Sequence, residues 1–194
     1  ANPEDYKRNG LMCIVNAKNV CIRGRGIVAC GGKELRENKR TTRVLFLLDS
    51  SDVSVEDVIL MDPASWNTQI INSDNVKMSN IKLINDISNL NTDGIDPDGA
   101  RHLTVDGMCA YCGDDCIAVK TTKTSVKQNN IRDSFDLAFK NCVLWTLASA
   151  LKVGTETMAD SMYDITFENN DIISADRALA IFVHDREHVH DIRF

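Results

Sequence analysis

The sequence predicts an all-β fold, a right-handed parallel β-helix of about six to seven coils. Three observations predict it: a short motif recurs along the chain, each copy alternates apolar and polar residues, and no helical 3.6-residue pattern separates the copies. Repeats of about 20 to 35 residues that hold several short strands are typical of solenoid coils. One coil cannot bury its apolar face alone, so its neighbour has to cover it.

The repeated motif is a polar residue, an aliphatic residue, any residue, a bulky apolar residue, any residue, and then Gly, Asp or Asn. This alternation is the period of a half-buried strand. A second short apolar stretch follows each copy, as in residues 142–145. Asn at the coil corners favours left-handed turns and side-chain ladders between coils. The copies begin at Asn19, Asp52, Asn75, His102, Asp136, Asp164 and Asp191, which are 33, 23, 27, 34, 28 and 27 residues apart.

Two other folds fit less well. A doubly wound α/β fold requires helices between its strands, and a leucine-rich repeat requires a leucine consensus and a more regular spacing. We therefore expect one β-helix domain over residues 1–194. The seventh copy begins only three residues before the last residue, Phe194, and a solenoid normally needs caps. We expect the domain to be a fragment of a longer chain.

The amino-acid composition and net charge limit the kinds of molecule that the chain could bind. Hydrophobic residues make up 43% and charged residues 26%, as in globular proteins. The formal net charge of −6 argues against nucleic-acid binding, because a phosphate backbone needs a basic surface. No apolar run approaches the roughly 18 residues of a membrane span. Residues 1–10 are polar and lack the layout of a signal peptide.

The cysteines do not predict a metal site. Seven is an odd number, so at least one is free or is paired between molecules. Cys109, Cys112 and Cys116 form C-x2-C-x3-C, but no second cluster or nearby His completes a zinc set. We expect the cysteines to pack mainly as small hydrophobic residues.

Alignment of the coils brings acidic residues together. Placing Ile95 over Ile117 puts Asp93 over Asp115, on adjacent coils about 4.8 Å apart, with Asp114 beside them. In the same column the alignment places three more side chains, those of Trp66, Ser149 and Arg177.

Close carboxylates cannot all be ionised, so one holds its proton while a neighbour stays charged. A glycosidase needs this division, because one carboxyl protonates the leaving oxygen while another activates water. The trio Asp93, Asp114 and Asp115 is therefore the candidate catalytic site. A turn role and a calcium site are its alternatives. For isolated acids such as Asp86 and Asp96 we expect only a turn role.

The strings that hold these residues resemble a known family. Residues 91–97, Asn-Thr-Asp-Gly-Ile-Asp-Pro, and residues 113–120, Gly-Asp-Asp-Cys-Ile-Ala-Val-Lys, resemble the two most diagnostic motifs of glycoside hydrolase family 28. This is the polygalacturonase family of pectin-lyase-like right-handed β-helices. Weaker likenesses at residues 19–32 and 62–81 extend the resemblance over nearly the whole chain.

The resemblance implies an inverting hydrolase of a polysaccharide or oligosaccharide that needs no metal or organic cofactor. It implies that Asp114 is the general acid, and that Asp93 and Asp115 hold and deprotonate the attacking water. It also implies a secreted or periplasmic protein. The substrate-binding candidates are Trp66, Asn91, Ser149, Lys152, Arg177 and His184, with Glu156 in the same second-tier group as Lys152 and His184.

Two departures from the family pattern bear on the substrate. Residues 148–150 read Ala-Ser-Ala where the family has Gly-His-Gly, and residues 180–182 read Ala-Ile-Phe where it has Arg-Ile-Lys. Because an arginine fork is hard to replace at a carboxylate, we expect a substrate other than plain polygalacturonate, with Arg177 as a conjectural substitute. The rival hypotheses are a catalytically inactive glycan-binding β-helix and a lyase or epimerase on the same fold.

Overall fold

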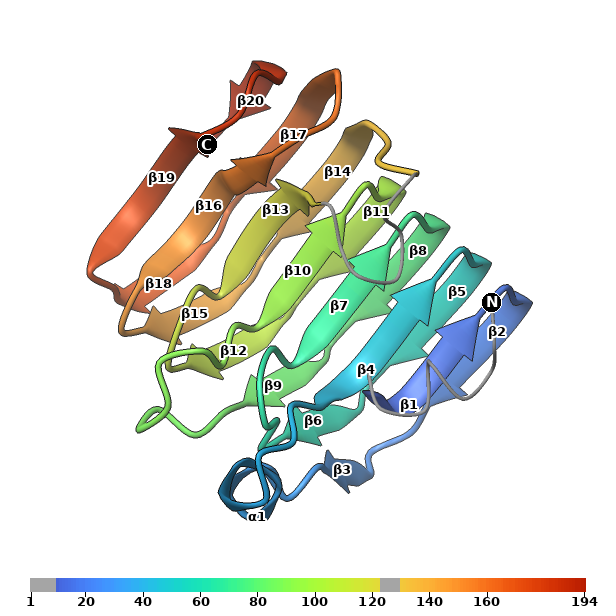
Figure 1. Cartoon of the computed structure of the whole chain (residues 1–194), viewed down its shortest axis with the longest axis vertical. Helices are drawn as coiled ribbons and strands as arrows, with labels where there is room; N and C mark the ends of the chain where they lie inside the picture. Colours follow the sequence, from blue (N-terminus) through green and yellow to red (C-terminus); the bar gives the residue numbers. More distant parts are fainter. Residues whose placement is uncertain (1–9, 123–129) are drawn as a thin grey trace.

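The computed structural model describes residues 10–122 and 130–194, so the expectation for residues 1–10 falls almost wholly outside it. The described residues form twenty strands and one short helix, α1 (Gly32–Glu37). The chain turns repeatedly through three strands and so builds three parallel sheets along one axis (Figure 1). This is the all-β, right-handed parallel β-helix that the repeats predict.

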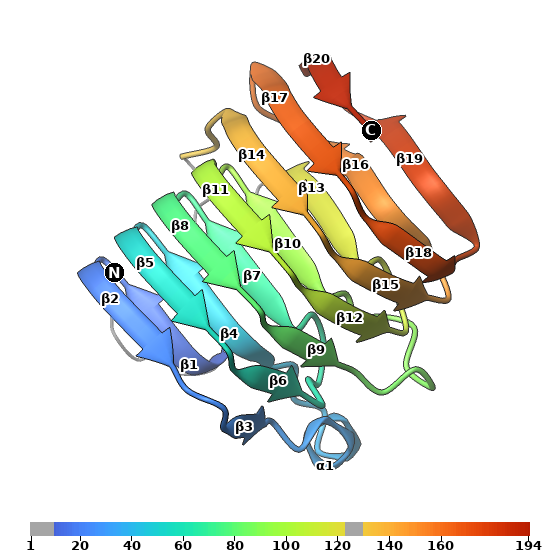
Figure 2. The same cartoon turned by 180° about the vertical axis from the view of Figure 1, so that it is seen from behind.

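Each sheet takes one strand from each turn of the chain. The first sheet contains, in spatial order, β1 (Gly10–Val15), β4 (Arg43–Leu48), β7 (Thr68–Ile71), β10 (Ile95–Asp98), β13 (Ile117–Thr121), β16 (Ser149–Thr157) and β19 (Arg177–Val183). The second sheet contains β2 (Lys18–Arg23), β5 (Ser51–Glu56), β8 (Asp74–Ser79), β11 (Arg101–Asp106), β14 (Ser134–Lys140), β17 (Ser161–Glu168) and β20 (His188–Arg193). The third sheet contains β3 (Ile27–Ala29), β6 (Ile59–Met61), β9 (Lys82–Ile84), β12 (Cys109–Cys112), β15 (Val143–Thr146) and β18 (Asp171–Ser174). Figure 2 shows the second sheet from its outer side.

The repeated motif forms the strands of the second sheet. The polar residue that begins each copy has a positive φ, between 51° and 59° across the seven copies. Asn and Asp tolerate this left-handed conformation, and His102 adopts it as well. The predicted side-chain ladders between coils are present, since Asn80 Nδ2 donates to Asp57 Oδ1 over 2.7 Å and Asn169 Nδ2 donates to Asn141 Oδ1 over 2.6 Å.

The inward side chains of the three sheets form one continuous core. Its fully buried members include Leu60, Val105, Ile117 and Phe139. Cys112, Cys116 and Cys142 are buried without a disulfide, which agrees with their expected role as small hydrophobic residues. In the part of the chain that the structure describes, no helix has the length and apolar character needed to cross a bilayer.

The strand register of the first sheet confirms the alignment made from the sequence. Ile95 pairs with Ile117, and Ile117 pairs in turn with Leu151. Ser149 pairs with Arg177. Together with the pairing of Thr68 and Ile95, this register places Trp66, Asp93, Asp115, Ser149 and Arg177 in one column across five coils.

Candidate active site

The three acidic residues converge where two neighbouring strands of the first sheet begin. Asp93 lies two residues before β10, and Asp114 and Asp115 lie just before β13. The amide of Gly94 donates to the carbonyl oxygen of Asp115 over 2.8 Å and so fixes one coil on the next. Carboxylate oxygens of Asp93, Asp114 and Asp115, one from each, all lie within 4.8 Å of one another. The structure thus brings the predicted trio together.

Two glycines explain the local sequence around these acids. A Cβ atom at Gly94 would lie 2.4 Å from the carbonyl oxygen of Cys116, and one at Gly113 would lie 2.5 Å from that of Asn89. Real Cβ atoms do not approach backbone oxygens this closely, so any side chain at either position would force the coils apart. The Asp-Gly and Gly-Asp pairs of the two motifs therefore let adjacent coils approach at the site.

The side chain of Asp115 accepts from two donors. The backbone amide of Ser149 donates to Oδ1 over 2.8 Å, and the ammonium group of Lys152 contacts Oδ2 at 2.6 Å. The side chain of Asp115 is only 4% exposed, so water screens this ion pair little. Hydrogen bonds and a cation that contact the charged form of a carboxyl favour that form.

Asp114 and Asp93 lie in environments that favour the protonated form. Burial, with the nearby charge of Asp115, raises the pKa of the half-buried Asp114 above its usual value. For the buried Asp93, burial and then the charge of Asp96 raise the pKa well above the usual value, although Lys120 opposes them. Oδ1 of Asp93 has no hydrogen-bond partner among the described residues. Two of the three acids, Asp93 and Asp114, therefore hold their protons more tightly than a free aspartic acid does.

A layer of charge behind the trio was not predicted from the sequence. Asp96 is a fully buried residue of β10, which corrects the expectation that it has only a turn role. The same expectation for Asp86 agrees with the structure, where Asp86 lies in a turn and accepts hydrogen bonds from Ser88. The ammonium group of Lys120 lies 2.9 Å from Oδ1 of Asp96. Lys120 was visible as the last residue of the second family-like motif, but nothing in the sequence alone shows where its side chain reaches.

The column residues beside the trio are already engaged with the protein. The indole N–H of Trp66 donates to Oδ1 of Asn91 over 3.3 Å, and Lys120 lies over the Trp66 ring. The Nε of Arg177 donates to Oγ of the buried Ser149 over 3.0 Å, and its guanidinium group also contacts Asp176. The Arg177 side chain stays 44% exposed.

The remaining substrate-binding candidates, Lys152, Glu156 and His184, lie in two different places. Lys152 and Glu156 lie on β16 beside the trio, Lys152 bound to Asp115 and Glu156 at 4.0 Å from Lys120. His184 follows β19, is 77% exposed at its side chain, and lines a shallow apolar hollow with Phe182 and Val183. These positions stay predictions of substrate contact.

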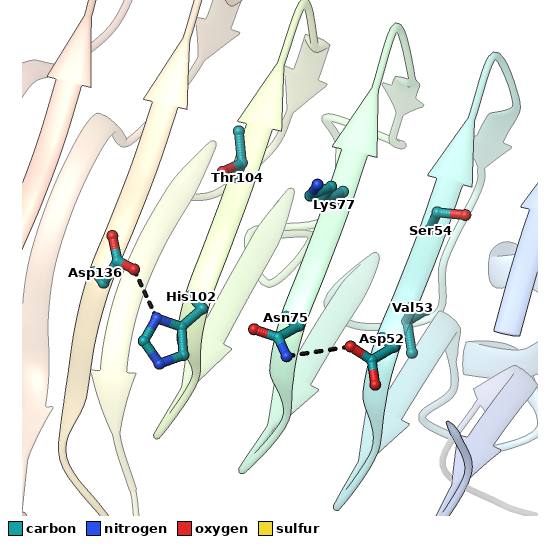
Figure 3. Close-up of a pocket in the computed structure, with 8 residues that line it drawn as sticks. All are labelled: Asp52, Val53, Ser54, Asn75, Lys77, His102, Thr104 and Asp136. Atoms are coloured by element: carbon teal, nitrogen blue, oxygen red, sulfur yellow. Dashed lines mark hydrogen bonds and ion pairs between the residues drawn. The ribbon is translucent and has the colours of Figure 1, made fainter. Parts of the chain in front are cut away.

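A second hollow lies on a different sheet. A shallow groove of about 480 Å³ lies across β5, β8, β11 and β14 of the second sheet. Figure 3 shows the side chains that line it. Its acidic groups pair with their neighbours: Nδ2 of Asn75 donates to Asp52 over 3.1 Å, and Nδ1 of His102 lies 2.6 Å from Oδ2 of Asp136. All of these groups face solvent, so the groove lacks the buried, converging carboxyls of the first sheet.

The fold and the site define the class of protein to which this chain belongs, the parallel β-helices, here with three carboxyls that converge on one sheet. A family model described as glycosyl hydrolases family 28 matches residues 2–182, and the chain belongs to this family.

Relatives and solved structures agree with that assignment. A probable polygalacturonase of Vitis vinifera is 32% identical over 75 residues, which cover 39% of this chain and 15% of that protein. A polygalacturonase of Arabidopsis thaliana is 25% identical over 142 residues, which cover 67% of this chain and 32% of that protein. The chain thus spans a third or less of these relatives.

Two solved structures share the fold at low sequence identity. The exopolygalacturonase of Thermotoga maritima superposes with a TM-score of 0.75 at 18% identity, over 89% of this chain and 48% of its own. The endo-xylogalacturonan hydrolase of Aspergillus tubingensis superposes with a TM-score of 0.58 at 16% identity, over 99% of this chain and 65% of its own.

Proposed function

We propose that this chain carries the catalytic site of a glycoside hydrolase that cleaves O-glycosidic bonds of a polysaccharide. The observation that carries the proposal is the convergence of Asp93, Asp114 and Asp115, whose nearest oxygens lie within 4.8 Å while their surroundings differ. General acid–base catalysis of glycoside cleavage needs one carboxyl that gives a proton and another that takes one. Membership of the hydrolase family supports the same reaction.

The proposed reaction is a direct displacement by water. Asp114, half-buried and with a raised pKa, gives its proton to the glycosidic oxygen as the bond from that oxygen to the anomeric carbon breaks. A water held by Asp93 and Asp115 attacks the anomeric carbon from the opposite face, and its proton passes to the carboxylate of Asp115. The product then has the inverted configuration, and NMR of the first product formed tests this. Product with retained configuration would contradict the direct displacement.

The substrate we propose is a neutral or decorated glycan rather than plain polygalacturonate. At the positions where the family has Arg-Ile-Lys, β19 carries Ala180, Ile181 and Phe182. Ile181 continues the inward-facing column of Val119 and Val153. Phe182 is 43% exposed, so the strand offers an apolar side chain where the family has its lysine. Lys152, on the neighbouring strand β16, is bound to Asp115 and so is not free to replace the missing lysine. A polysaccharide substrate also fits the extracellular or periplasmic location that we propose from the family.

The test is a reducing-sugar assay on neutral and acidic polysaccharides with the wild type and Asp114→Asn. We expect the variant to lose a factor of about 10² to 10⁴ in turnover, because general acid catalysis contributes on that order. Its circular dichroism and unfolding midpoint should stay near those of the wild type, since Asp114 is only half-buried. Unchanged turnover would remove the proposed acid from the mechanism.

A chelator separates the hydrolase from the metal-dependent alternatives. Lys120 and Lys152 place ammonium groups 3.7 Å from Asp93 and 2.6 Å from Asp115, which leaves less negative charge for a cation than three bare carboxylates would. We therefore expect activity to persist in the chelator. Products that absorb in the ultraviolet would indicate a lyase instead.

The inactive glycan-binding protein remains the second candidate. The Ala-Ser-Ala string at residues 148–150, in place of Gly-His-Gly, favours it. Oligosaccharide binding by both the wild type and Asp114→Asn, with no reducing ends released by either, is the result that identifies this function.

A further inference from the structure

One buried lysine connects the acidic trio to the residues around it. Lys120 lies on β13, and its side chain is only 5% exposed. Its ammonium group lies 2.9 Å from Oδ1 of Asp96, 3.7 Å from Oδ2 of Asp93 and 4.0 Å from Oε2 of Glu156. These partners lie on β10 or its approach and on β16, on either side of β13, so the contacts of the lysine span three coils. Because the group is almost dry, salt screens these contacts little.

The same ammonium group also lies against an aromatic ring. Its nitrogen is 3.9 Å from the centroid of the Trp66 ring, and the guanidinium carbon of Arg43 lies 5.2 Å from that centroid. A desolvated cation over an indole ring gains about 2 kcal/mol or more from the ring quadrupole. Two cations thus occupy space at Trp66 that a stacked sugar would otherwise use, and the ring contributes to the arrangement of the charges.

The charges in this layer depend on one another. Burial raises the pKa of Asp96 to about 6, and the charge of Lys120 opposes this increase. Burial alone would lower the pKa of Lys120, but the charges of Asp96 and Asp93 outweigh it and raise the pKa above its usual value. The ammonium group therefore keeps its proton at neutral pH, and its positive charge lies between two acids that would otherwise repel each other.

We propose that Lys120 is a positioning residue of this site, whose ammonium group joins Asp93, Asp96 and the Trp66 ring into one unit and fixes the Asp93 carboxyl toward Asp114 and Asp115. This inference rests on the proposed function, because it assigns Lys120 a role through Asp93. At 5% exposure Lys120 does not reach a substrate, so its role is indirect.

A titration that needs no substrate tests the charge coupling. In a Trp145→Phe background Trp66 is the remaining tryptophan, and its fluorescence against pH follows the protonation of the neighbouring acids. Lys120→Met should raise the midpoint by about one to three pH units, since a cation at this distance lowers a carboxyl pKa by about that much. Lys77→Met, the same change at an exposed lysine of the second sheet, should leave it unchanged.

Lys120→Arg distinguishes charge from shape. It keeps the positive charge, so the midpoint of the fluorescence titration should return to within about one pH unit of the wild-type value. The fall of kcat/KM on the acid side of its pH profile should shift in the same direction. If Lys120→Met does not fold, Glu156→Gln serves instead: it removes one negative charge 4.0 Å from the lysine and should lower the midpoint.

The results separate this inference from the proposed function. An unchanged midpoint in Lys120→Met, or in Glu156→Gln where that variant serves, overturns the role of Lys120 even if the wild type hydrolyses glycans. A wild type with no hydrolase activity overturns the proposed function, yet a shifted midpoint in Lys120→Met still supports the coupling of Lys120 to the acids.

Discussion

The acidic trio of the first sheet and the groove of the second sheet are built in the same way and differ in burial. Each stacks polar side chains from successive coils, and each contains a contact of the same length between a side-chain nitrogen and a carboxylate. Nδ1 of His102 lies 2.6 Å from Asp136, and Nζ of Lys152 lies 2.6 Å from Asp115. The side chains of the first pair are 48% and 58% exposed, whereas those of the second are 13% and 4% exposed.

The comparison indicates that stacking of polar side chains on successive coils is not enough for a reactive site, and that burial of the stacked side chains is also needed. In water, opposite charges at contact distance gain little, since solvent already stabilises each of them. In a dry environment the same charges lose their hydration, so each depends on its partner and its protonation responds to its neighbours. The groove therefore resembles an ordinary solvated sheet face, and the trio does not.

The largest expected difference is in catalysis. Asp115→Asn should lower kcat by about 10² to 10⁴, because it removes the carboxylate that helps to deprotonate the attacking water. Asp136→Asn makes the same chemical change in the groove and should leave kcat within about twofold of the wild type. Steady-state kinetics of both variants at one pH, with circular dichroism as the folding control, measure this difference. Equal losses would show that the two regions are not functionally distinct.

The second expected difference is in the pH dependence of stability. Burial raises the pKa of Asp98, at the end of β10, to about 6. A carboxyl whose pKa is higher in the folded than in the unfolded state holds its proton better when folded, so the free energy of unfolding falls as pH rises from about 4 to above 6. For Asp98 the loss is roughly 3 kcal/mol, from a shift of about two units.

Asp98→Asn should remove that part of the pH dependence. The variant should lose less stability between pH 4.5 and 7.5 than the wild type, as measured by urea unfolding. Asp136→Asn, exposed on the second sheet, is the matched control and should follow the wild type. A wild type that gains stability as the pH rises over this range, with Asp98→Asn unchanged, would contradict the assignment.

The smallest expected effect is that of the exposed pair. His102→Ala removes the contact with Asp136 and should cost less than about 1 kcal/mol, since exposed ion pairs contribute little. Thermal unfolding at low and high salt measures it, and the difference from the wild type should shrink in high salt. A cost of several kcal/mol would show that the groove is more than a solvated face.

The fold and the main column could be predicted because a solenoid has simple register. Once Ile95 is placed over Ile117, the backbone spacing sets which side chains stack, and the structure confirms the positions of Trp66, Ser149 and Arg177. The alternating apolar pattern carries this information, since a slip of one residue would turn the core side chains outward.

The charges behind the column could not be predicted in the same way. Lys120 pairs in register with Asp98, but its long side chain bends toward Asp96 and Asp93. Register fixes where a Cα lies, whereas the end of a flexible four-carbon chain goes where charge and space allow. Asp96 was taken for a turn residue for a related reason: its sequence neighbours Ile95 and Pro97 do not reveal the lysine that compensates it one coil away.

The close approach at Gly94 and Gly113 has an evolutionary consequence. Because the spacing between the acids comes from stacked backbones, loops outside these contacts do not determine the distance between the reacting groups. Such loops can lengthen, shorten or change composition while the chemistry stays in place, whereas residues 85–92 are constrained because Asn89 packs against Gly113. New sugar preferences can therefore arise through changes in the loops around the site, without compensating changes at the three acids.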